Sequence, residues 1–172
     1  PSALNLSEHG TVPYVKVEDL NNTDKFQLTS RTFVDEGEFA VPVNSVIFPK
    51  RGAAIFSNKI RIAALPMVLD TNLMAVECVS EIDPEFLYYA ITNAGLFKLA
   101  DTSTIPQLNN KHILPYRLPR PKMAEQKKIV SVLATWDATI SAKVNLIANS
   151  RNQKQALMQR LLTGKQRLPG FS

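Results

Sequence analysis

The sequence predicts an α+β protein in which a mixed, β-rich α/β globule is followed by one long coiled-coil helix. Short apolar segments separated by turn residues fill the first part of the chain, a pattern typical of several short strands. From Lys122 to Thr163 the chain then contains neither Gly nor Pro, which is typical of an uninterrupted helix. We therefore divide the chain into a globular domain (1–121), a helix (122–164) and a C-terminal tail (165–172).

Segments of the globular domain that are fully apolar, or that alternate with polar residues, are expected to form strands. In chain order these segments are 11–17, 26–28, 32–34, 46–48, 53–56, 60–64, 67–69 and 73–79. Pro13 limits the first of them to a sheet edge or a strand start, because proline lacks the N–H that a ladder needs. Pro115 limits a later extended segment, 113–118, to an edge for the same reason.

Two short helices are expected after these strands. Asp83 followed by Pro84 predicts a helix start, because aspartate accepts hydrogen bonds from the first N–H groups and proline suits the first helical position. This helix is expected to end at Gly95, and a second piece is expected over residues 96–100. Residues 101–112 are polar and are expected to form a loop.

The segment after the prolines would form a helix about 60 Å long. Its apolar residues recur in steps of four and three, which gives a narrow stripe typical of a coiled-coil seam. The apolar members of the seam are Ile129, Leu133, Trp136, Ile140, Ile147, Leu157 and Leu161. Trp136 is expected either to pack within this seam or to anchor another partner. Lys143 and Lys154 interrupt the seam and are expected to set register or orientation, so the helix needs a partner helix.

The composition argues against a catalytic protein and against a metal site. Cys78 is the single cysteine, which excludes internal disulfides and fits a reducing cytoplasm. His9 and His112 lie far apart without a carboxylate at ligand spacing, so no metal site is expected. The sequence shows no phosphate-binding loop, Gly-rich cofactor fingerprint or nucleophile motif, so we name no catalytic residue and favour a binding module. No apolar run reaches transmembrane length, so no membrane partner is expected.

Charge is distributed unevenly along the chain. The net charge of +5 combines −4 over residues 1–49, +2 over 50–121 and +7 over 122–172. A nucleic-acid partner would therefore be contacted by the middle of the chain and by the helix and tail. Lys50 and Arg51 follow an apolar strand and precede a glycine. Arginine can match guanine with two donors and lysine can reach phosphates, and the alternative is an ordinary solvated turn.

The polar loop 101–112 offers a second group of candidate DNA-binding residues. Thr, Ser, Gln, Asn and Lys side chains can hydrogen-bond to base edges and to the backbone oxygens of DNA. The candidates in this loop are Thr102, Ser103, Thr104, Gln107, Asn109, Asn110 and Lys111. For each of them a capping or turn role is the alternative.

Four segments in the second half of the chain resemble the specificity (S) subunit of type I restriction-modification systems. They read S-T-I-P-Q-L-N-N-K-H-I, P-R-P-K-M-A-E-Q-K-K-I-V-S-V-L, W-D-A-T-I and L-M-Q-R-L-L-T-G-K-Q-R-L. The earlier V-P-Y-V-K-V-E-D-L and F-P-K-R-G also resemble the target recognition domain of that family. The resemblance implies sequence-specific binding of double-stranded DNA without catalysis, in a bacterial or archaeal cytoplasm. It also implies a modification (methyltransferase) subunit, which methylates adenine with S-adenosylmethionine, and a restriction subunit as partners; no cofactor is expected in this chain.

The resemblance also bears on the size of the assembly. A complete S subunit carries two recognition domains and two antiparallel spacer helices, whereas this chain has one of each. It is therefore expected to be a fragment or a half-subunit that pairs with a second recognition half or with its own copy and reads half of a bipartite target. Lys122 and Met123 replace the usual proline and leucine before A-E-Q, which bears on where the helix starts. The alternatives are a stand-alone restriction endonuclease or methyltransferase fragment, and a coiled-coil adaptor without a DNA role.

Overall fold

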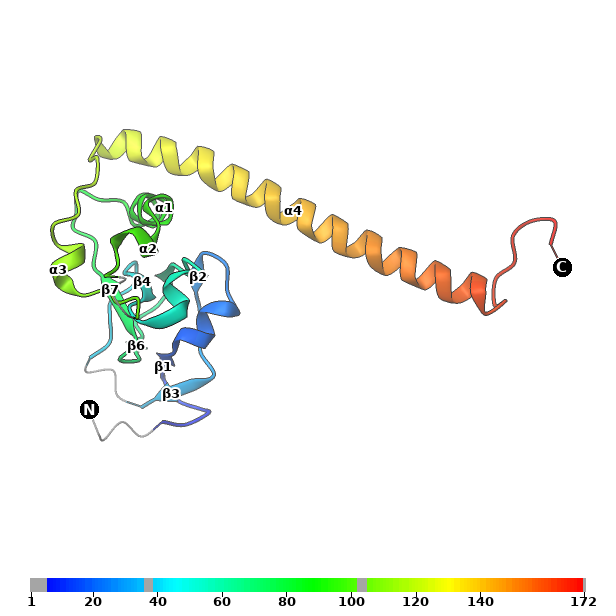
Figure 1. Cartoon of the computed structure of the whole chain (residues 1–172), viewed down its shortest axis with the longest axis horizontal. Helices are drawn as coiled ribbons and strands as arrows, with labels where there is room; N and C mark the ends of the chain where they lie inside the picture. The colour runs from blue at the N-terminus through cyan, green and yellow to red at the C-terminus, as the bar shows by residue number, and fades with distance from the viewer. Residues whose placement is uncertain (1–5, 36–38, 102–104, 172) are drawn as a thin grey trace. The chain divides into compact units, whose positions relative to one another are not determined.

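The computed structural model describes residues 6–35, 39–101 and 105–171 (Figure 1). The chain forms two compact units, Pro1–Val130 and Ser131–Ser172. The start of the long helix therefore belongs to the globular unit, and the second unit holds the rest of that helix and the tail.

The globular unit combines short strands with short helices, which confirms the predicted α+β fold class (Figure 1). The strands are β1 (Val12–Val15), β2 (Phe26–Gln27), β3 (Thr32–Val34), β4 (Val46–Pro49), β5 (Arg61–Ala63), β6 (Val68–Leu69) and β7 (Leu73–Val76). The helical segments are the 3-10 turns η1 (Val17–Asn21) and η2 (Gly52–Ile55) and the helices α1 (Pro84–Ala94), α2 (Leu96–Leu99), α3 (Asn110–Ile113) and α4 (Met123–Leu162). The strands form two sheets, with the orders β3-β1-β6 and β2-β5-β4-β7.

Strand β4 is the centre of the core, because it is buried on both faces and pairs antiparallel with β5 and β7. Val46 and Phe48 belong to an apolar cluster that includes Leu87 and other residues of α1 and α2. Ile47, which lies between them, belongs to a second cluster that includes Val15 of β1. This two-sided burial explains why the segment is a continuous apolar run and not an alternating one.

Pro13 lies in β1, the middle strand of its sheet, and the structure shows why proline is tolerated there. The partner residue Phe33 exchanges both of its backbone hydrogen bonds with Ser7, on the other side of β3. Pro13 and Phe33 therefore form a pair that needs no mutual backbone hydrogen bond. The parallel pairing with β6 begins only at Tyr14, so Pro13 precedes that ladder, but β1 begins at Val12 and is not the predicted edge strand.

Helix α1 begins and ends as predicted. The Asp83 carboxylate oxygen Oδ1 accepts hydrogen bonds from the backbone N–H groups of Glu85 (3.0 Å) and Phe86 (3.1 Å). Pro84 occupies the first helical turn, where its missing N–H is not required. Gly95 ends the helix with a φ of 81°, a conformation that favours glycine.

Two predicted strands are wrong. Residues 53–56 form most of η2 and its end, because Gly52 takes a φ of 73° and turns the chain out of the extended direction. Residues 113–118, all within the described part of the chain, form no strand: α3 ends at Ile113, and the segment then runs without ladder partners. The polar loop also ends earlier than predicted, since α3 begins inside it.

Candidate nucleic-acid interface

The structure brings the two predicted binding segments together, although they are far apart in the sequence. The backbone N–H of Leu108 donates to the carbonyl oxygen of Lys50 (2.8 Å), and that of Gly52 donates to the carbonyl oxygen of Pro106 (2.9 Å). Between these two hydrogen bonds, Arg51 lies opposite Gln107 in an antiparallel bridge. The basic turn and the polar loop are therefore one local ladder.

In this ladder the side chains of Arg51 and Lys50 project to opposite faces. Residues directly opposite each other in a ladder project their side chains to the same face, and neighbours along the strand project to opposite faces. Arg51 is exposed and shares its face with Gln107, whereas Leu108 is fully buried on the face toward the core. Lys50 lies opposite Leu108 and is half-buried. Arg51 and Gln107 thus form the outward-facing part of the predicted site.

Gln107 also pairs on its other side, with Asp101. The two residues exchange backbone hydrogen bonds of 2.9 and 3.0 Å. A carboxylate-bearing residue therefore lies next to the Arg51–Gln107 pair in this ladder. The amide Nε2 of Gln107 lies 3.5 Å from Asn109 Oδ1, which is the one side-chain hydrogen-bond contact of Gln107 among the described residues and is a weak one.

The remaining loop residues have mixed placements. Asn109 is half-buried at the start of α3, where its backbone N–H donates to His112 Nδ1 (3.1 Å), an arrangement that fits the capping alternative. Asn110 and Lys111 are exposed on the first turn of α3. The candidates Thr102, Ser103 and Thr104 lie outside the described residues.

The cations around this ladder differ from those that are paired within the globular unit, such as Arg31 and Lys59. Within residues 6–35, 39–101 and 105–171, no hydrogen bond or ion pair engages the side chains of Lys50, Arg51, Lys98 and Lys111. Elsewhere Arg31 binds Glu18 and Asp19, and Lys59 donates to Asn21 Oδ1. The cations next to the ladder therefore remain available to an anionic partner.

Sequence reasoning did not single out Phe56, Phe97 and Lys98, which lie close along the chain to this ladder. Phe56 follows η2, which starts directly after Arg51, and Phe97 lies on α2 shortly before Asp101. The sequence signal was weak, because an isolated Phe within a short apolar segment is usually a core residue. Only the structure shows that both rings are exposed.

Gln126 of the A-E-Q motif is a second residue whose role the sequence did not reveal. It is fully buried near the start of α4. Its Nε2 donates to the carbonyl oxygens of Glu81 (2.8 Å) and Pro121 (2.9 Å), and its Oε1 accepts from the backbone N–H of Asp83 (2.9 Å). Because Asp83 also caps α1, one amide side chain connects the starts of α1 and α4.

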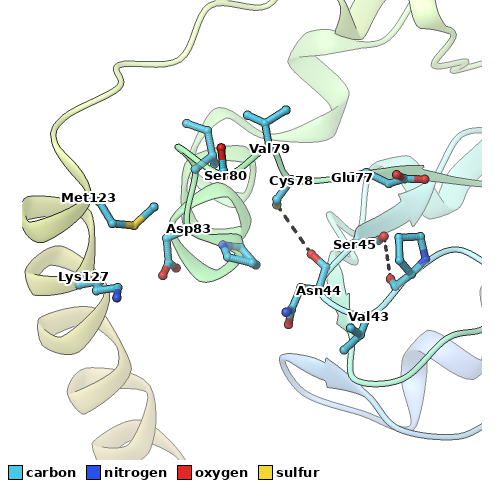
Figure 2. A pocket seen from close by; sticks show the side chains of 13 residues that line it. Val43, Asn44, Ser45, Glu77, Cys78, Val79, Ser80, Asp83, Met123 and Lys127 are labelled. Atoms are coloured by element: carbon cyan, nitrogen blue, oxygen red, sulfur yellow. Dashed lines mark hydrogen bonds between the residues drawn. The ribbon is translucent and has the colours of Figure 1, made fainter.

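A groove of about 620 Å³ lies beside this connection, between residues 42–45, the segment 77–84 and the start of α4 (Figure 2). Cys78 lies in it, with its thiol 3.7 Å from the Asn44 carbonyl oxygen. Burial, with a smaller contribution from Asp83, raises the pKa of the Cys78 thiol to about 11. The thiol is therefore protonated at neutral pH and is a poor nucleophile.

Two further features of the described residues bear on the class of protein. No group of three or more His, Cys, Asp or Glu side chains in this part of the chain could hold a metal ion. The same residues include no helix that is both long enough and apolar enough to cross a membrane.

Helix α4 confirms the predicted long helix and presents the predicted seam without a covering partner in this single chain. Its 40 residues correspond to about 60 Å. Ile129 and Leu133 are half-buried, and the later seam residues are exposed to solvent. The exposed fractions are 64% for Trp136, 57% for Ile140, 52% for Ile147, 49% for Leu157 and 37% for Leu161. These seam side chains are therefore available to a partner helix.

Comparison with known proteins identifies the family. The family model described as "Type I restriction modification DNA specificity domain" matches residues 1–149. The specificity subunit of the Escherichia coli type I restriction enzyme EcoR124I/EcoR124II is 22% identical over 141 residues, covering 76% of this chain and 34% of that protein. The Methanocaldococcus jannaschii type I restriction enzyme MjaIX specificity subunit is 26% identical over 158 residues, which cover 86% of this chain and 34% of that protein. The chain thus spans about a third of the length of the curated relatives it matches.

Solved structures show the same fold. A chain from a study of complex assembly and conformational transition of the type I R-M system superposes with a TM-score of 0.73 at 18% identity, covering 90% of this chain and 38% of that one. The HsdS subunit from Thermoanaerobacter tengcongensis gives a TM-score of 0.59 at 18% identity, and the match covers 93% of this chain and 39% of that one. Both named relatives are specificity subunits, the class of subunit that the sequence motifs predict. The chain therefore belongs to the family of type I restriction-modification DNA specificity domains.

Proposed function

We propose that this chain is the DNA-recognition part of a type I specificity subunit and that it reads one half of a bipartite target without catalysing a reaction itself. The observation that carries this proposal is the ladder in which the exposed Arg51 lies opposite the half-buried Gln107. Family membership supports the same function, since the matched family is defined by DNA specificity.

The chemistry of the ladder fits base recognition in the major groove. A guanidinium group can donate two hydrogen bonds to O6 and N7 of guanine, and a glutamine amide can bind N6 and N7 of adenine. Arg51 supplies the guanidinium group and Gln107 supplies the amide, and the two residues lie opposite each other in the ladder. Lys98 and Lys111 are exposed and suited to phosphates, which position a protein on DNA but do not specify sequence.

The proposal extends to assembly through α4. An exposed apolar seam of this length is stabilised when a second helix covers it. The partner would be a second recognition half or another copy of this chain, packed antiparallel as a spacer of fixed length. A methyltransferase subunit, which would bind S-adenosylmethionine, and a restriction subunit would complete the complex in the cytoplasm. The excess of positive charge on the helix and tail suits contact with DNA or with an acidic partner surface.

The recognition proposal is tested by selecting bound duplexes from a random pool and titrating the selected target at several salt concentrations. Arg51→Ala should weaken target binding by about 1–3 kcal/mol and relax the preference at one base pair. Lys111→Ala should weaken binding to all sequences alike and lower the salt dependence by about one charge.

Arg51→Lys is the matched control, because it keeps the charge but removes the two-pronged geometry. It should bind unrelated duplexes like the parent while losing part of the target preference. If Arg51→Ala binds the target like the parent at every salt concentration, this ladder is not the reader.

The assembly proposal is tested with Ile140→Asp combined with Ile147→Asp. Two carboxylates in the seam would have to be buried without partners, so self-association should be lost. Asn145→Asp combined with Asn152→Asp is the control, because these positions lie on the opposite side of the heptad and add the same charge. Light scattering gives the mass of each protein. A dimeric parent whose mass is unchanged by the seam substitutions would contradict the proposal.

A further inference from the structure

A stacked pair of aromatic rings lies exposed on the globular unit. The ring centroids of Phe56 and Phe97 are 4.5 Å apart with an interplanar angle of 28°. Phe56 is 58% exposed and Phe97 is 42% exposed. Among the described residues, neither ring belongs to the two buried apolar clusters or to the side chains packed against them. A large part of each ring is therefore accessible to a partner.

The pair is held in place by the residues around it. Asn58, two positions after Phe56, has a φ of 49°. Its amide Nδ2 donates to the carbonyl oxygen of Thr92 (2.9 Å), and its Oδ1 accepts from the backbone N–H of Leu96 (2.9 Å). Both sides of the aromatic pair are thus tied together by one side chain. The backbone segments that carry the two rings are therefore held together before a partner binds, which lowers the ordering cost of binding.

The chemistry surrounding the pair favours a polyanion with apolar surfaces. Phe56 is five residues beyond Arg51, along η2. Phe97 is followed directly by Lys98, and Asp101 then pairs with Gln107 of the proposed reading face. Lys98 has no side-chain partner among the described residues. An apolar protein partner would leave these cations without compensation, whereas DNA offers both base faces and phosphates.

We infer that Phe56 inserts beside a base step of the bound target and partly unstacks it, with Phe97 supporting the ring from behind and Lys98 contacting a flanking phosphate. This inference rests on the proposed function. Apolar side chains that wedge between base steps are a known way for proteins to hold deformed DNA. The contact would add recognition of an easily unstacked step beside the base pairs that Arg51 and Gln107 read.

The experiment uses the full chain and the duplex obtained by selection, with the fluorescent base analogue 2-aminopurine placed at successive positions. Binding of the parent should raise the fluorescence at one step only, because unstacking removes quenching. Phe56→Ala should abolish that rise and weaken binding about ten- to hundredfold, the range expected for a lost base–aromatic contact. Phe97→Ala should reduce the rise, and Phe56→Trp should retain it.

Phe39→Ala is the matched control, because Phe39 is 76% exposed and lies in a different segment of the globular unit. It should bind and fluoresce like the parent, and thermal unfolding should show that the variants remain folded. Unchanged affinity of Phe56→Ala, or weaker binding with the fluorescence rise retained, overturns the inference while the proposed function stands. A parent that selects no sequence from the pool overturns the proposed function and the inference with it.

Discussion

Two groups of polar side chains in the globular unit have opposite surroundings. Asp19, Lys25 and Gln126 are buried or half-buried, and each is held by several partners within the chain. Arg51 and Lys98 are exposed and have no side-chain partner among the described residues. The comparison separates polar groups that maintain the fold from polar groups that are available to another molecule.

Lys25 illustrates the first group. Its ammonium donates to Glu85 Oε2 (2.8 Å) and to the Tyr89 hydroxyl (2.7 Å). Burial by itself would lower the pKa of Lys25, but these hydrogen bonds outweigh burial and raise the pKa well above its ordinary value. Lys25, which directly precedes β2, therefore links that part of the chain to α1. Substitutions in the two groups should accordingly differ in kind: loss of stability in the first and loss of binding in the second.

The largest effect on stability is expected at Gln126. Gln126→Leu removes the hydrogen-bond partner of the Asp83 N–H and of two carbonyl oxygens, and should lower the free energy of unfolding by about 3 kcal/mol. Denaturant unfolding measures this change. Gln155→Leu, an exposed glutamine of the same helix, is the matched control and should change stability by less than about 0.5 kcal/mol. Equal effects of the two substitutions would refute the structural role assigned to Gln126.

A smaller and pH-dependent effect is expected at Asp19, which is 2% exposed. Its oxygens accept hydrogen bonds from Arg31 Nε (2.7 Å), the Lys16 backbone N–H (2.9 Å) and the Ser30 hydroxyl (3.0 Å). Burial would raise the pKa of this carboxyl, but the hydrogen bonds outweigh burial and hold the pKa below its ordinary value. The stability that the carboxylate supplies is therefore complete above pH about 4 and is lost as the pH falls through the folded-state pKa.

Asp19→Asn should lower the free energy of unfolding by about 2 kcal/mol at pH 7, because an amide cannot accept hydrogen bonds at both positions. The difference from the parent should shrink as the pH falls below about 4. Asp24→Asn, at an exposed position, is the control and should change the free energy of unfolding at pH 7 by less than about 0.5 kcal/mol. A difference that stays constant from pH 7 to pH 3 would show that the effect is one of packing and not of charge.

The comparison also shows where sequence reasoning succeeded. The Asp83 cap, the apolar strand β4 and the long helix α4 depend on local patterns, and all three are present. The strand predicted over residues 53–56 failed because Gly52 redirects the chain, although the apolar pattern alone fits a strand. Periodicity does not report such a turn.

The candidate site was predicted in its parts but not in its arrangement. Lys50, Arg51 and Gln107 were chosen for their chemistry, in two separate segments. That Arg51 and Gln107 share a face depends on a pairing between distant segments, which no local pattern encodes. The interior role of Gln126 was missed for the same reason, since its partners lie in the segment before α1 and in the turn before α4. Exposure of Phe56 and Phe97 likewise depends on how the whole unit packs.

The smallest effect on stability is expected at Arg51, whose role in binding is the central claim. Arg51→Ala should change the free energy of unfolding by less than about 0.5 kcal/mol, because the side chain is exposed and has no partner among the described residues. The most direct measurement is the ratio of affinities for the selected target and a scrambled duplex, for the parent and for Arg51→Ala at one salt concentration. The account predicts that this ratio falls about 5- to 150-fold in the variant, mostly through weaker target binding. An unchanged ratio, or a parent that does not distinguish the two duplexes, would contradict it.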